Sequence, residues 1–253
     1  MTARELWQRF FLIRTCASCG ELLRFEEREE AFCPSCREVW DKEKVCSCGQ
    51  CLQSVSECRC MSDKLSKSGM LALRRLTFYE TDGGSASRRA VLFLKDNRNR
   101  RVAKFFALQL AFVLREECEL LGVSPTELVV TYAPRSDKAV LRRGFDQAAL
   151  IAEALAEAVG AEYAALLVRR RGGKEQKSLN LGQRQRNVGK RFALGEEARH
   201  VCADRTVVLV DDIVTTGASM SACAVLLRRA GARGVLGLCI SSVPKTKGRQ
   251  NNT

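Results

Sequence analysis

The stretch Val207-Val208-Leu209-Val210-Asp211-Asp212-Ile213-Val214-Thr215-Thr216-Gly217-Ala218-Ser219 carries the clearest structural signal in this chain. Four aliphatic residues lead into two acids, and a loop of small and hydroxyl-bearing residues follows them. Residues 220–230 then have the apolar spacing of a helix. This order of strand, loop and helix places free backbone N–H groups and the positive end of the helix dipole beside the loop. The stretch therefore predicts an anion site of the kind that holds a phosphate.

The two acids, Asp211 and Asp212, are expected where their strand ends, at the carboxyl edge of a parallel sheet. Ligands of open α/β folds bind at that edge. A carboxylate pair there suits the two vicinal hydroxyls of a ribose, with Mg²⁺ nearby and a phosphate on the loop. A plainer interpretation is that the acids only cap the next helix. The loop behind them favours a ligand, because its glycine lets the backbone approach an anion closely.

The whole stretch resembles the 5-phosphoribosyl 1-pyrophosphate (PRPP) motif of the type I phosphoribosyltransferases. The resemblance implies that Asp211 and Asp212 hold the 2′- and 3′-hydroxyls of the ribose. It also implies that the loop cradles the 5′-phosphate, through Thr215, Thr216, Gly217, Ala218 and Ser219.

Charge divides the 253-residue chain near residue 62. Residues 1–62 carry 9 Lys or Arg against 10 Asp or Glu, whereas the rest of the chain has a net charge of +14. The basic part favours an anionic partner, either phosphorylated small molecules or nucleic acid, although part of the excess can serve solubility alone.

Neither a membrane span nor a signal peptide is expected in this sequence. No apolar run is long enough to cross a bilayer. The segment Met1–Arg14 lacks the uninterrupted apolar core of a signal peptide and is interpreted as a short amphipathic helix. The sequence therefore predicts a cytoplasmic protein.

Nine of the thirteen cysteines precede residue 61, and in a cytoplasmic chain such clustering points to metal, because disulfides would be reduced there. Two C-x-x-C turns provide one set of four thiolates, which suits tetrahedral zinc: Cys16, Cys19, Cys33 and Cys36. A second, less regularly spaced set follows: Cys48, Cys51, Cys58 and Cys60. Cys46 is left as the spare, although a Cys46–Cys48 pairing is an alternative. With all ligands from protein, we expect two structural zinc ions.

The remaining cysteines and the single histidine are expected to play no part in metal binding. Four cysteines lie among apolar residues without C-x-x-C spacing and are predicted to be small core side chains: Cys118, Cys202, Cys223 and Cys239. His200 is expected at the surface.

Strand and helix patterns alternate after a polar, flexible-looking junction at residues 62–69. We expect strands at 70–80, 128–134, near 163–168, 206–210 and 234–241, and helices at 87–95, 102–121 and 148–159, with Gly122 and Gly160 as stops. The helix 102–121 is expected to bury an apolar stripe of Phe105, Leu108, Ala111, Phe112 and Leu120. The pattern predicts an α/β fold, with a parallel sheet flanked by helices on both faces.

Two loops are expected near the same sheet edge as the acid pair. The first, Arg135-Ser136-Asp137-Lys138, follows the strand at 128–134. The second, residues 169–191, holds nine Lys or Arg and one Glu. It is either a basic linker without fixed structure or a lid that neutralises a leaving pyrophosphate.

These segments extend the resemblance to the ComF family, which joins a double zinc ribbon to a type I phosphoribosyltransferase domain. Matching features are the cysteine turns, Tyr132-Ala133-Pro134-Arg135-Ser136, the box Leu141-Arg142-Arg143-Gly144-Phe145-Asp146-Gln147-Ala148, and Gln183-Arg184-Gln185-Arg186-Asn187-Val188. Two departures are Asp146, where the family usually has Asn, and the irregular spacing of the second cysteine set. The resemblance implies a double zinc ribbon with a short N-terminal helix (1–62), a phosphoribosyltransferase-like domain (63–243) and a flexible basic tail (244–253).

Three functions are compatible with this resemblance. One is a Mg²⁺-dependent transferase acting on PRPP, with Asp211, Asp212 and Arg135 as candidate catalytic residues. Arg135 and Ser136 are expected to contact the pyrophosphate, with Arg142 or Arg143 nearby. Another is a competence factor in natural transformation that binds single-stranded DNA and a DNA-translocating helicase. In the third, the zinc ribbon is a docking platform for a protein partner. The sequence names no acceptor for the transferase.

Overall fold

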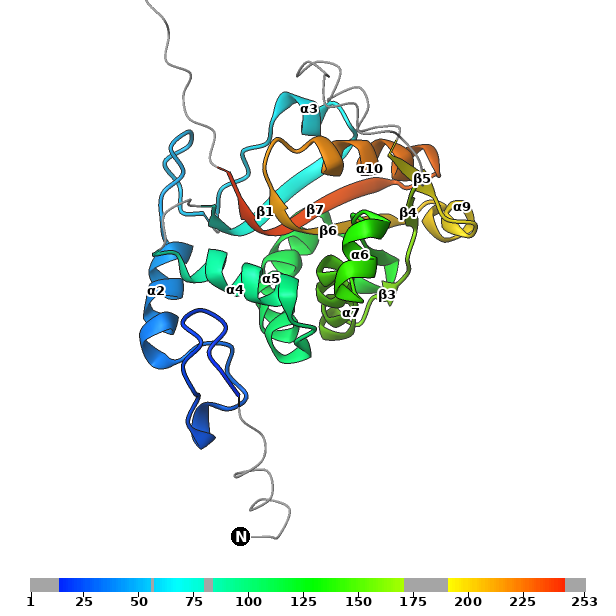
Figure 1. Cartoon of the computed structure of the whole chain (residues 1–253). Helices are drawn as coiled ribbons and strands as arrows, with labels where there is room; N and C mark the ends of the chain where they lie inside the picture. Colours follow the sequence, from blue (N-terminus) through cyan, green and yellow to red (C-terminus); the bar gives the residue numbers. More distant parts are fainter. Residues whose placement is uncertain (1–13, 56, 80–83, 171–190, 244–253) are drawn as a thin grey trace, which may run out of the picture.

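The fold is seen in a computed structural model that describes residues 14–55, 57–79, 84–170 and 191–243. A five-stranded sheet with the order β1-β7-β6-β2-β3 forms its centre, and all neighbouring strands run parallel (Figure 1). The strands are β1 (Met70–Phe78), β2 (Leu128–Tyr132), β3 (Glu162–Tyr163), β6 (Thr206–Val214) and β7 (Gly234–Ser242). The predicted fold class, a parallel sheet flanked by helices, is confirmed.

Helices cover both faces of the sheet (Figure 1). Val208 and Val210 of β6 pack in one apolar cluster with α4 (Ala86–Asp96), α5 (Arg100–Leu121) and α7 (Gln147–Val159). Val207 and Leu209 pack in the other cluster with α3 (Asp63–Ser66), α9 (Ala198–Cys202) and α10 (Ala218–Arg229). Successive strand side chains point to opposite faces, so a continuous aliphatic run fills both layers.

Smaller elements complete the described chain. They are the helices α2 (Pro34–Lys44) and α6 (Asp137–Arg143), the antiparallel pair β4 (Leu167–Arg169) and β5 (Phe192–Leu194), and the 3-10 turns η1 (Phe25–Glu27) and η2 (Pro125–Glu127).

The long helices begin and end where their terminal residues allow it. The Asn99 side chain accepts a hydrogen bond from the Val102 backbone N–H at 3.1 Å and so caps α5. Gly122 and Gly160 follow α5 and α7 with φ of 62° and 70°, the left-handed conformation that glycine adopts most easily. The predicted helix stops at these two glycines are confirmed.

The predicted apolar stripe of α5 is largely wrong. Leu108, Phe112 and Leu120 are 51%, 64% and 62% exposed, whereas the buried face is made of Val102, Phe106, Leu110 and Leu114, together with Ala103, Ala107, Ala111, Val113 and Cys118. The helix has apolar residues around much of its circumference, so periodicity alone does not select the face that packs on the sheet.

The strand predicted near residues 163–168 is two short strands in different sheets. Glu162 and Tyr163 pair with β2, whereas Leu167 pairs antiparallel with Leu194 of β5. Between them the chain turns away from the central sheet, and the Leu166 backbone N–H donates to the Thr131 hydroxyl at 3.2 Å.

The polar junction at residues 62–69 is ordered as α3 and its flanks. The Ser62 side chain caps this short helix by accepting from the Leu65 backbone N–H at 3.4 Å. Leu65 and Ser68 are buried, and Leu65 packs in the cluster of α10. The predicted flexible linker is therefore a packed turn of helix at this position.

The cysteine-rich segment packs directly on the helices of the sheet. Trp40 of α2 is fully buried, with ring centroids 5.4 Å from Phe105 and 5.6 Å from Phe106 of α5. The carboxylate of Glu43 accepts backbone N–H groups of Ala86 and Ser87, at 2.5 and 3.1 Å, at the start of α4. An acid at a helix N-terminus is stabilised by the helix dipole and by the free N–H groups there.

Candidate functional site

The loop that the sequence predicts to hold a phosphate (residues 215–219, called the phosphate loop below) joins β6 to the start of α10. Thr215 and Thr216 are exposed, and Gly217 is the N-cap of α10 with φ of 71°. The Thr216 hydroxyl accepts the Ala218 backbone N–H at 3.4 Å. A Cβ added to Gly217 would lie 3.0 Å from the side chain of Leu65, so α3 packs against the loop from one side. The loop therefore meets the N-terminus of a twelve-residue helix, which is a favourable environment for an anion.

The acid pair lies inside β6 and not beyond its end. Asp211 is in register with Cys239, and Ile213 with Ser241, so β6 continues to Val214. The continuation is possible because β7 runs alongside to Ser242 and offers hydrogen-bonding partners. The acids nevertheless lie among the last four residues of β6, just before the phosphate loop. They are therefore at the carboxyl edge of the sheet, where the sequence predicts them.

Three polar side chains from different elements converge on buried Asp212. Its Oδ2 lies 3.2 Å from Lys95 Nζ and 3.2 Å from a guanidinium nitrogen of Arg135, and it accepts a hydrogen bond from the Gln147 side-chain amide. Burial alone would raise the pKa of this carboxyl, but the cations Lys95 and Arg135 outweigh it and lower the pKa below its usual value. Asp212 is therefore ionised and held in place.

Asp211 has the opposite electrostatic character. Burial, and then the negative charge of Asp212 beside it, raise its pKa well above the usual value. Its Oδ1 accepts the backbone N–H of Asp212 at 2.8 Å. Because the side chain is only partly buried by the surrounding chain, Asp211 is the acid of the pair that a ligand can reach.

The loop after β2 contributes Arg135 through its backbone as well as its side chain. The Arg135 backbone N–H donates to Asp146 Oδ2 at 2.8 Å, and Asp146 Oδ1 accepts the Ala148 backbone N–H at 3.0 Å at the start of α7. Burial raises the pKa of Asp146. Asp146, which stands where the family usually has Asn, therefore caps α7 and also holds the loop at Arg135.

The other predicted pyrophosphate residues make contacts with groups other than the acid pair. Ser136 is the N-cap of α6, where its hydroxyl accepts the Ala139 backbone N–H at 3.4 Å. Arg143 pairs with Asp96 at 3.1 Å, next in sequence to Lys95. Arg142 is exposed near the end of the same helix. In the described ranges, Arg135 is the predicted basic residue that contacts the acid pair.

Sequence reasoning missed Lys95 and Gln147. Gln147 stands in the box around Arg142 and Arg143, so its position was visible but its role was not. Lys95 sits in the last turn of α4, where a lysine is common on any helix, and no motif marks it. The helix packing that brings α4 to the end of β6 could not be read from spacing.

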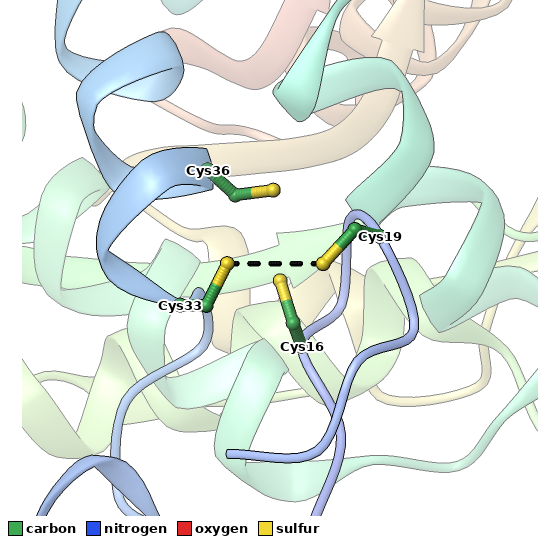
Figure 2. Close-up of side chains that lie close together, drawn as sticks. All are labelled: Cys16, Cys19, Cys33 and Cys36. Atoms are coloured by element: carbon green, nitrogen blue, oxygen red, sulfur yellow. Dashed lines mark hydrogen bonds between the residues drawn. The ribbon is translucent and has the colours of Figure 1, made fainter. Parts of the chain in front are cut away.

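The first cysteine group assembles as predicted. The sulfurs of Cys16, Cys19, Cys33 and Cys36 all lie within 4.8 Å of one another (Figure 2). Figure 2 shows Cys33 and Cys36 at the start of α2 facing Cys16 and Cys19 on the opposite turn, with 3.7 Å between the sulfurs of Cys19 and Cys33. Four sulfurs at this separation fit one tetrahedral ion, so the group could hold zinc.

The second group of neighbouring sulfurs includes Cys48 and not Cys46. The sulfurs of Cys48, Cys51, Cys58 and Cys60 lie within 4.8 Å of one another, whereas the exposed Cys46 points its thiol to the Lys42 carbonyl at 3.5 Å. The assignment of Cys46 as the spare agrees with this grouping, and the second group could also hold zinc.

In each group the pKa of one thiol is lowered, whereas burial raises the pKa of Cys19 and Cys33 in the first group and of Cys58 and Cys60 in the second. The N–H of Ser18 points to Cys16 Sγ at 3.4 Å, and the N–H of Gln50 points to Cys48 Sγ at 3.5 Å. Burial acts to raise the pKa of both thiols, but the hydrogen bonds from these and neighbouring backbone N–H groups have the larger effect. The net result is a lowered pKa, about 7 for Cys16 and about 6 for Cys48. Thiolate character at neutral pH is what a metal ligand needs.

The remaining predictions fall on the core, the surface or undescribed parts of the chain. Cys118, Cys202, Cys223 and Cys239 are buried as predicted, and His200 is exposed. The predicted N-terminal helix, the basic lid at 171–190 and the tail at 244–253 lie outside the described residues. None of the helices in the described ranges combines the length and apolar character needed to span a bilayer.

The parallel sheet, the phosphate loop and the acid pair together define a phosphoribosyltransferase type of domain. The family model for the phosphoribosyl transferase domain matches residues 139–250. The chain is also 26% identical over 227 residues to competence protein ComFC of Streptococcus pneumoniae, covering 88% of this chain and 93% of that protein. With the two cysteine groups that fit a zinc ribbon, these findings confirm the predicted ComF family and its phosphoribosyltransferase domain.

Three solved structures are similar to part of the chain. An allosteric regulatory enzyme of purine biosynthesis is 27% identical, with 44% of this chain and 21% of that chain covered and a TM-score of 0.29. A glutamine PRPP amidotransferase from B. subtilis is 24% identical, with 44% of this chain and 22% of that chain covered and a TM-score of 0.30. A protein of Thermus thermophilus is 20% identical, with 58% of this chain and 85% of that chain covered and a TM-score of 0.32. The chain spans about a fifth of the length of the first two. Because these TM-scores are low, the assignment rests on the family model and the sequence relative.

Proposed function

We propose that this protein binds PRPP with Mg²⁺ at the carboxyl end of β6 and is a competence-related phosphoribosyltransferase. The observation that carries the proposal is the convergence of the Asp211–Asp212 pair, Arg135 and the loop before α10 at one sheet edge. The family match and the similarity to ComFC support the same assignment.

The two acids would have different roles at the ribose, because Asp212 is already bonded to protein groups. A carboxylate has about four lone-pair sites. Asp212 uses Oδ2 for Lys95, Arg135 and Gln147, and its Oδ1 accepts the Ile213 backbone N–H at 2.8 Å. That leaves Asp212 little capacity for a hydroxyl, so Asp211 would make the main contact with the 2′- and 3′-hydroxyls.

The phosphate groups would lie on either side of the ribose. The loop Thr215–Ser219 and the N-terminus of α10 would hold the 5′-phosphate with backbone N–H and hydroxyl donors. Arg135 and Ser136, which precede α6, would face the pyrophosphate, together with Arg142 and Arg143 at the end of α6. Mg²⁺ bound with the ligand would supply positive charge that offsets the charge of the phosphate groups.

The protein's part in catalysis would be electrostatic. Breaking the bond between C1 and the pyrophosphate oxygen leaves positive charge on the ribose and negative charge on the leaving group. Carboxylates near the ribose and cations near the pyrophosphate stabilise both developing charges. Arg135 would link the ribose region and the pyrophosphate region, because its guanidinium already contacts Asp212.

The two cysteine groups are proposed to hold two structural zinc ions, one each. All four ligands of each group come from the protein, so neither ion has an open position for a substrate. Elemental analysis of protein purified without chelators should give two zinc ions per chain. One ion or fewer would remove the second site from the proposal.

Calorimetric titration with PRPP and Mg²⁺ tests the ligand assignment. The parent should bind saturably, and Asp211→Asn should weaken binding about tenfold to a hundredfold, the value of one charge-assisted hydrogen bond. Asp41→Asn is a matched control, because it makes the same change on α2, where Asp41 pairs with Arg37 and Lys44 at 3.2 and 3.0 Å. Equal loss in both variants would argue against a specific ribose contact.

A second candidate function is binding of single-stranded DNA and of a DNA-translocating helicase in transformation. It is favoured by the name of the relative, competence protein ComFC, and by the net charge of +14 after residue 62. A salt series separates the two functions: DNA binding should weaken steeply with salt, and Asp211→Asn should leave it unchanged or slightly stronger. DNA binding that collapses in Asp211→Asn, in a parent that never binds PRPP, would assign the acid pair to nucleic acid.

A further inference from the structure

The second cysteine group is attached to the edge of the sheet through charged side chains. β1 is an edge strand, and the segment Cys58-Arg59-Cys60 lies against it. Arg59 reaches the buried Glu117 of α5 at 3.4 Å, and Glu117 also pairs with Arg74 of β1 at 2.7 Å. The next residue of the strand, Arg75, turns to the cysteines.

Arg75 is buried and holds the cysteine segment with its guanidinium. One terminal nitrogen donates to the Cys60 carbonyl at 2.6 Å and to the Leu73 carbonyl at 3.2 Å. The other lies 3.9 Å from the sulfur of Cys58. Arg75 is therefore a cation, 5% exposed, placed directly beside one of the four sulfurs.

The charge of the cysteine group explains why a buried arginine belongs there. Four thiolates around one divalent ion leave a net charge of roughly −2, and a negative group in a buried position needs a cation nearby. Without the ion the cysteine group carries less negative charge, and within the described residues no carboxylate pairs with Arg75, since Glu117 is already held by Arg74 and Arg59.

A pocket connects the second cysteine group to the phosphate loop. Its lining includes Cys48, Gln50 and Cys60 of the cysteine segment together with Thr215, Thr216 and Gly217 of the loop. Arg75 and Ser242 also line it, and both are buried. Arg75 Nε and Ser242 Oγ have no hydrogen-bond partner among the residues that the structure describes. These two residues of the pocket lining therefore have hydrogen-bonding capacity that the described protein groups leave unused.

We propose that Arg75 couples the second cysteine group to this pocket. Its terminal nitrogens balance the charge of the metal-loaded cysteines. The same guanidinium forms a polar part of the pocket lining beside Thr215–Gly217. Loading of the second group then sets the affinity for a phosphorylated ligand, because metal loss frees both Arg75 and the cysteine wall. The inference rests on the proposed zinc and PRPP sites and adds a positioning residue that links them.

The test uses full-length Arg75→Gln, Arg75→Lys and Arg205→Gln. Arg205 is the control, since its guanidinium donates to the Leu128 carbonyl at 2.8 Å and pairs with Glu162, on the β2 and β3 side of the sheet and not at the β1 edge. Zinc transfer to a chromogenic chelator and calorimetric PRPP affinity are measured on each protein. The ion of the first cysteine group is the internal standard, because Arg75 contacts only the second.

Arg75→Gln should release one zinc ion about tenfold to a hundredfold faster, the usual effect of an outer-sphere partner, while the other ion leaves at the parental rate. PRPP affinity should fall about tenfold. Arg75→Lys keeps the charge but not Nε, so it should retain zinc and still bind PRPP less tightly; it decides the matter if Arg75→Gln does not fold. Arg205→Gln should change neither readout in the folded protein.

Parental zinc retention in Arg75→Gln would overturn the proposal, and so would faster zinc release with PRPP affinity unchanged. A parent without a second zinc ion, or one that does not bind PRPP, would instead contradict the zinc or PRPP assignment itself. The failures of the coupling and of the underlying sites are therefore distinguishable.

Discussion

Two neighbouring carboxylates in β6 have opposite electrostatic surroundings. Asp212 is held ionised by Lys95 and Arg135, whereas burial and the charge of Asp212 raise the pKa of Asp211. One acid therefore stabilises the folded protein through its charge, and the other is destabilising when it is charged. A ligand or Mg²⁺ that binds at Asp211 would relieve that repulsion, which is a reason for such a pair to exist at a binding site.

Neutral substitutions should reveal this asymmetry in stability. Asp212→Asn leaves the cations Lys95 and Arg135 without their counter-charge and should lower the free energy of unfolding by about 2 kcal/mol, less than for a fully buried pair because both cations are partly exposed. Asp211→Asn removes a repulsion and should leave stability unchanged or higher. Urea denaturation of both variants at neutral pH measures the difference, and the reverse order of stabilities would contradict the electrostatic account.

The pH dependence of Asp211→Asn follows from the raised pKa of Asp211. A carboxyl with a raised pKa in the folded state binds more protons folded than unfolded, so it costs stability as pH rises above its unfolded value. The advantage of Asp211→Asn over the parent should therefore be absent near pH 3 and grow as pH rises above about 4. Unfolding free energies measured from acid to neutral pH check this, and an advantage that shrinks as pH rises would be incompatible with it.

At the level of elements, the junction of β6, Gly217 and α10 was predictable because its signals are local. A continuous aliphatic run specifies a buried strand, and Gly217 before α10 takes the left-handed conformation that few other residues tolerate. The packed face of α5 was not predictable, since Leu108 and Phe112 are as apolar as the buried Phe106 and Leu110. Lys95 was missed for the same reason: tertiary packing of α4 brings it to Asp212.

Gly217→Ala should damage the phosphate loop beyond backbone strain alone. The left-handed conformation costs a residue with a Cβ about 1–2 kcal/mol, and the new Cβ would also lie 3.0 Å from Leu65. Gly160→Ala is the matched control, with φ of 70° and nothing within 4 Å of the added Cβ. Thermal unfolding should show a larger loss for Gly217→Ala, and PRPP affinity should fall only in that variant. Equal losses of stability would mean that α3 does not support the loop.

At the scale of the whole molecule, the cysteine segment and the sheet share apolar contacts. Phe32 and Trp40 belong to the same buried cluster as α4 and α5, and Glu43 caps α4. A boundary near residue 62 between a zinc ribbon and a phosphoribosyltransferase domain remains a prediction. The shared cluster means that the two parts should influence each other's stability even where each has its own role.

Trp40→Ala should lower the stability of the sheet domain and not only that of the zinc segment. Removing a fully buried tryptophan costs about 3–5 kcal/mol, and here the lost contacts include Phe105 and Phe106 of α5. Hydrogen exchange of β6 and β7 amides reports the sheet directly and should become faster. Unchanged protection of those strands would show that the cysteine segment unfolds independently.

The central claim is that the phosphoribosyl group binds where β6 meets α10. A crystal structure of the protein with PRPP and Mg²⁺ tests it most directly. The account predicts the 5′-phosphate against the backbone N–H groups of Thr215–Ser219 and the ribose hydroxyls within hydrogen-bond distance of Asp211. PRPP bound elsewhere, or a complex in which Asp211 makes no contact with the ribose, would contradict it.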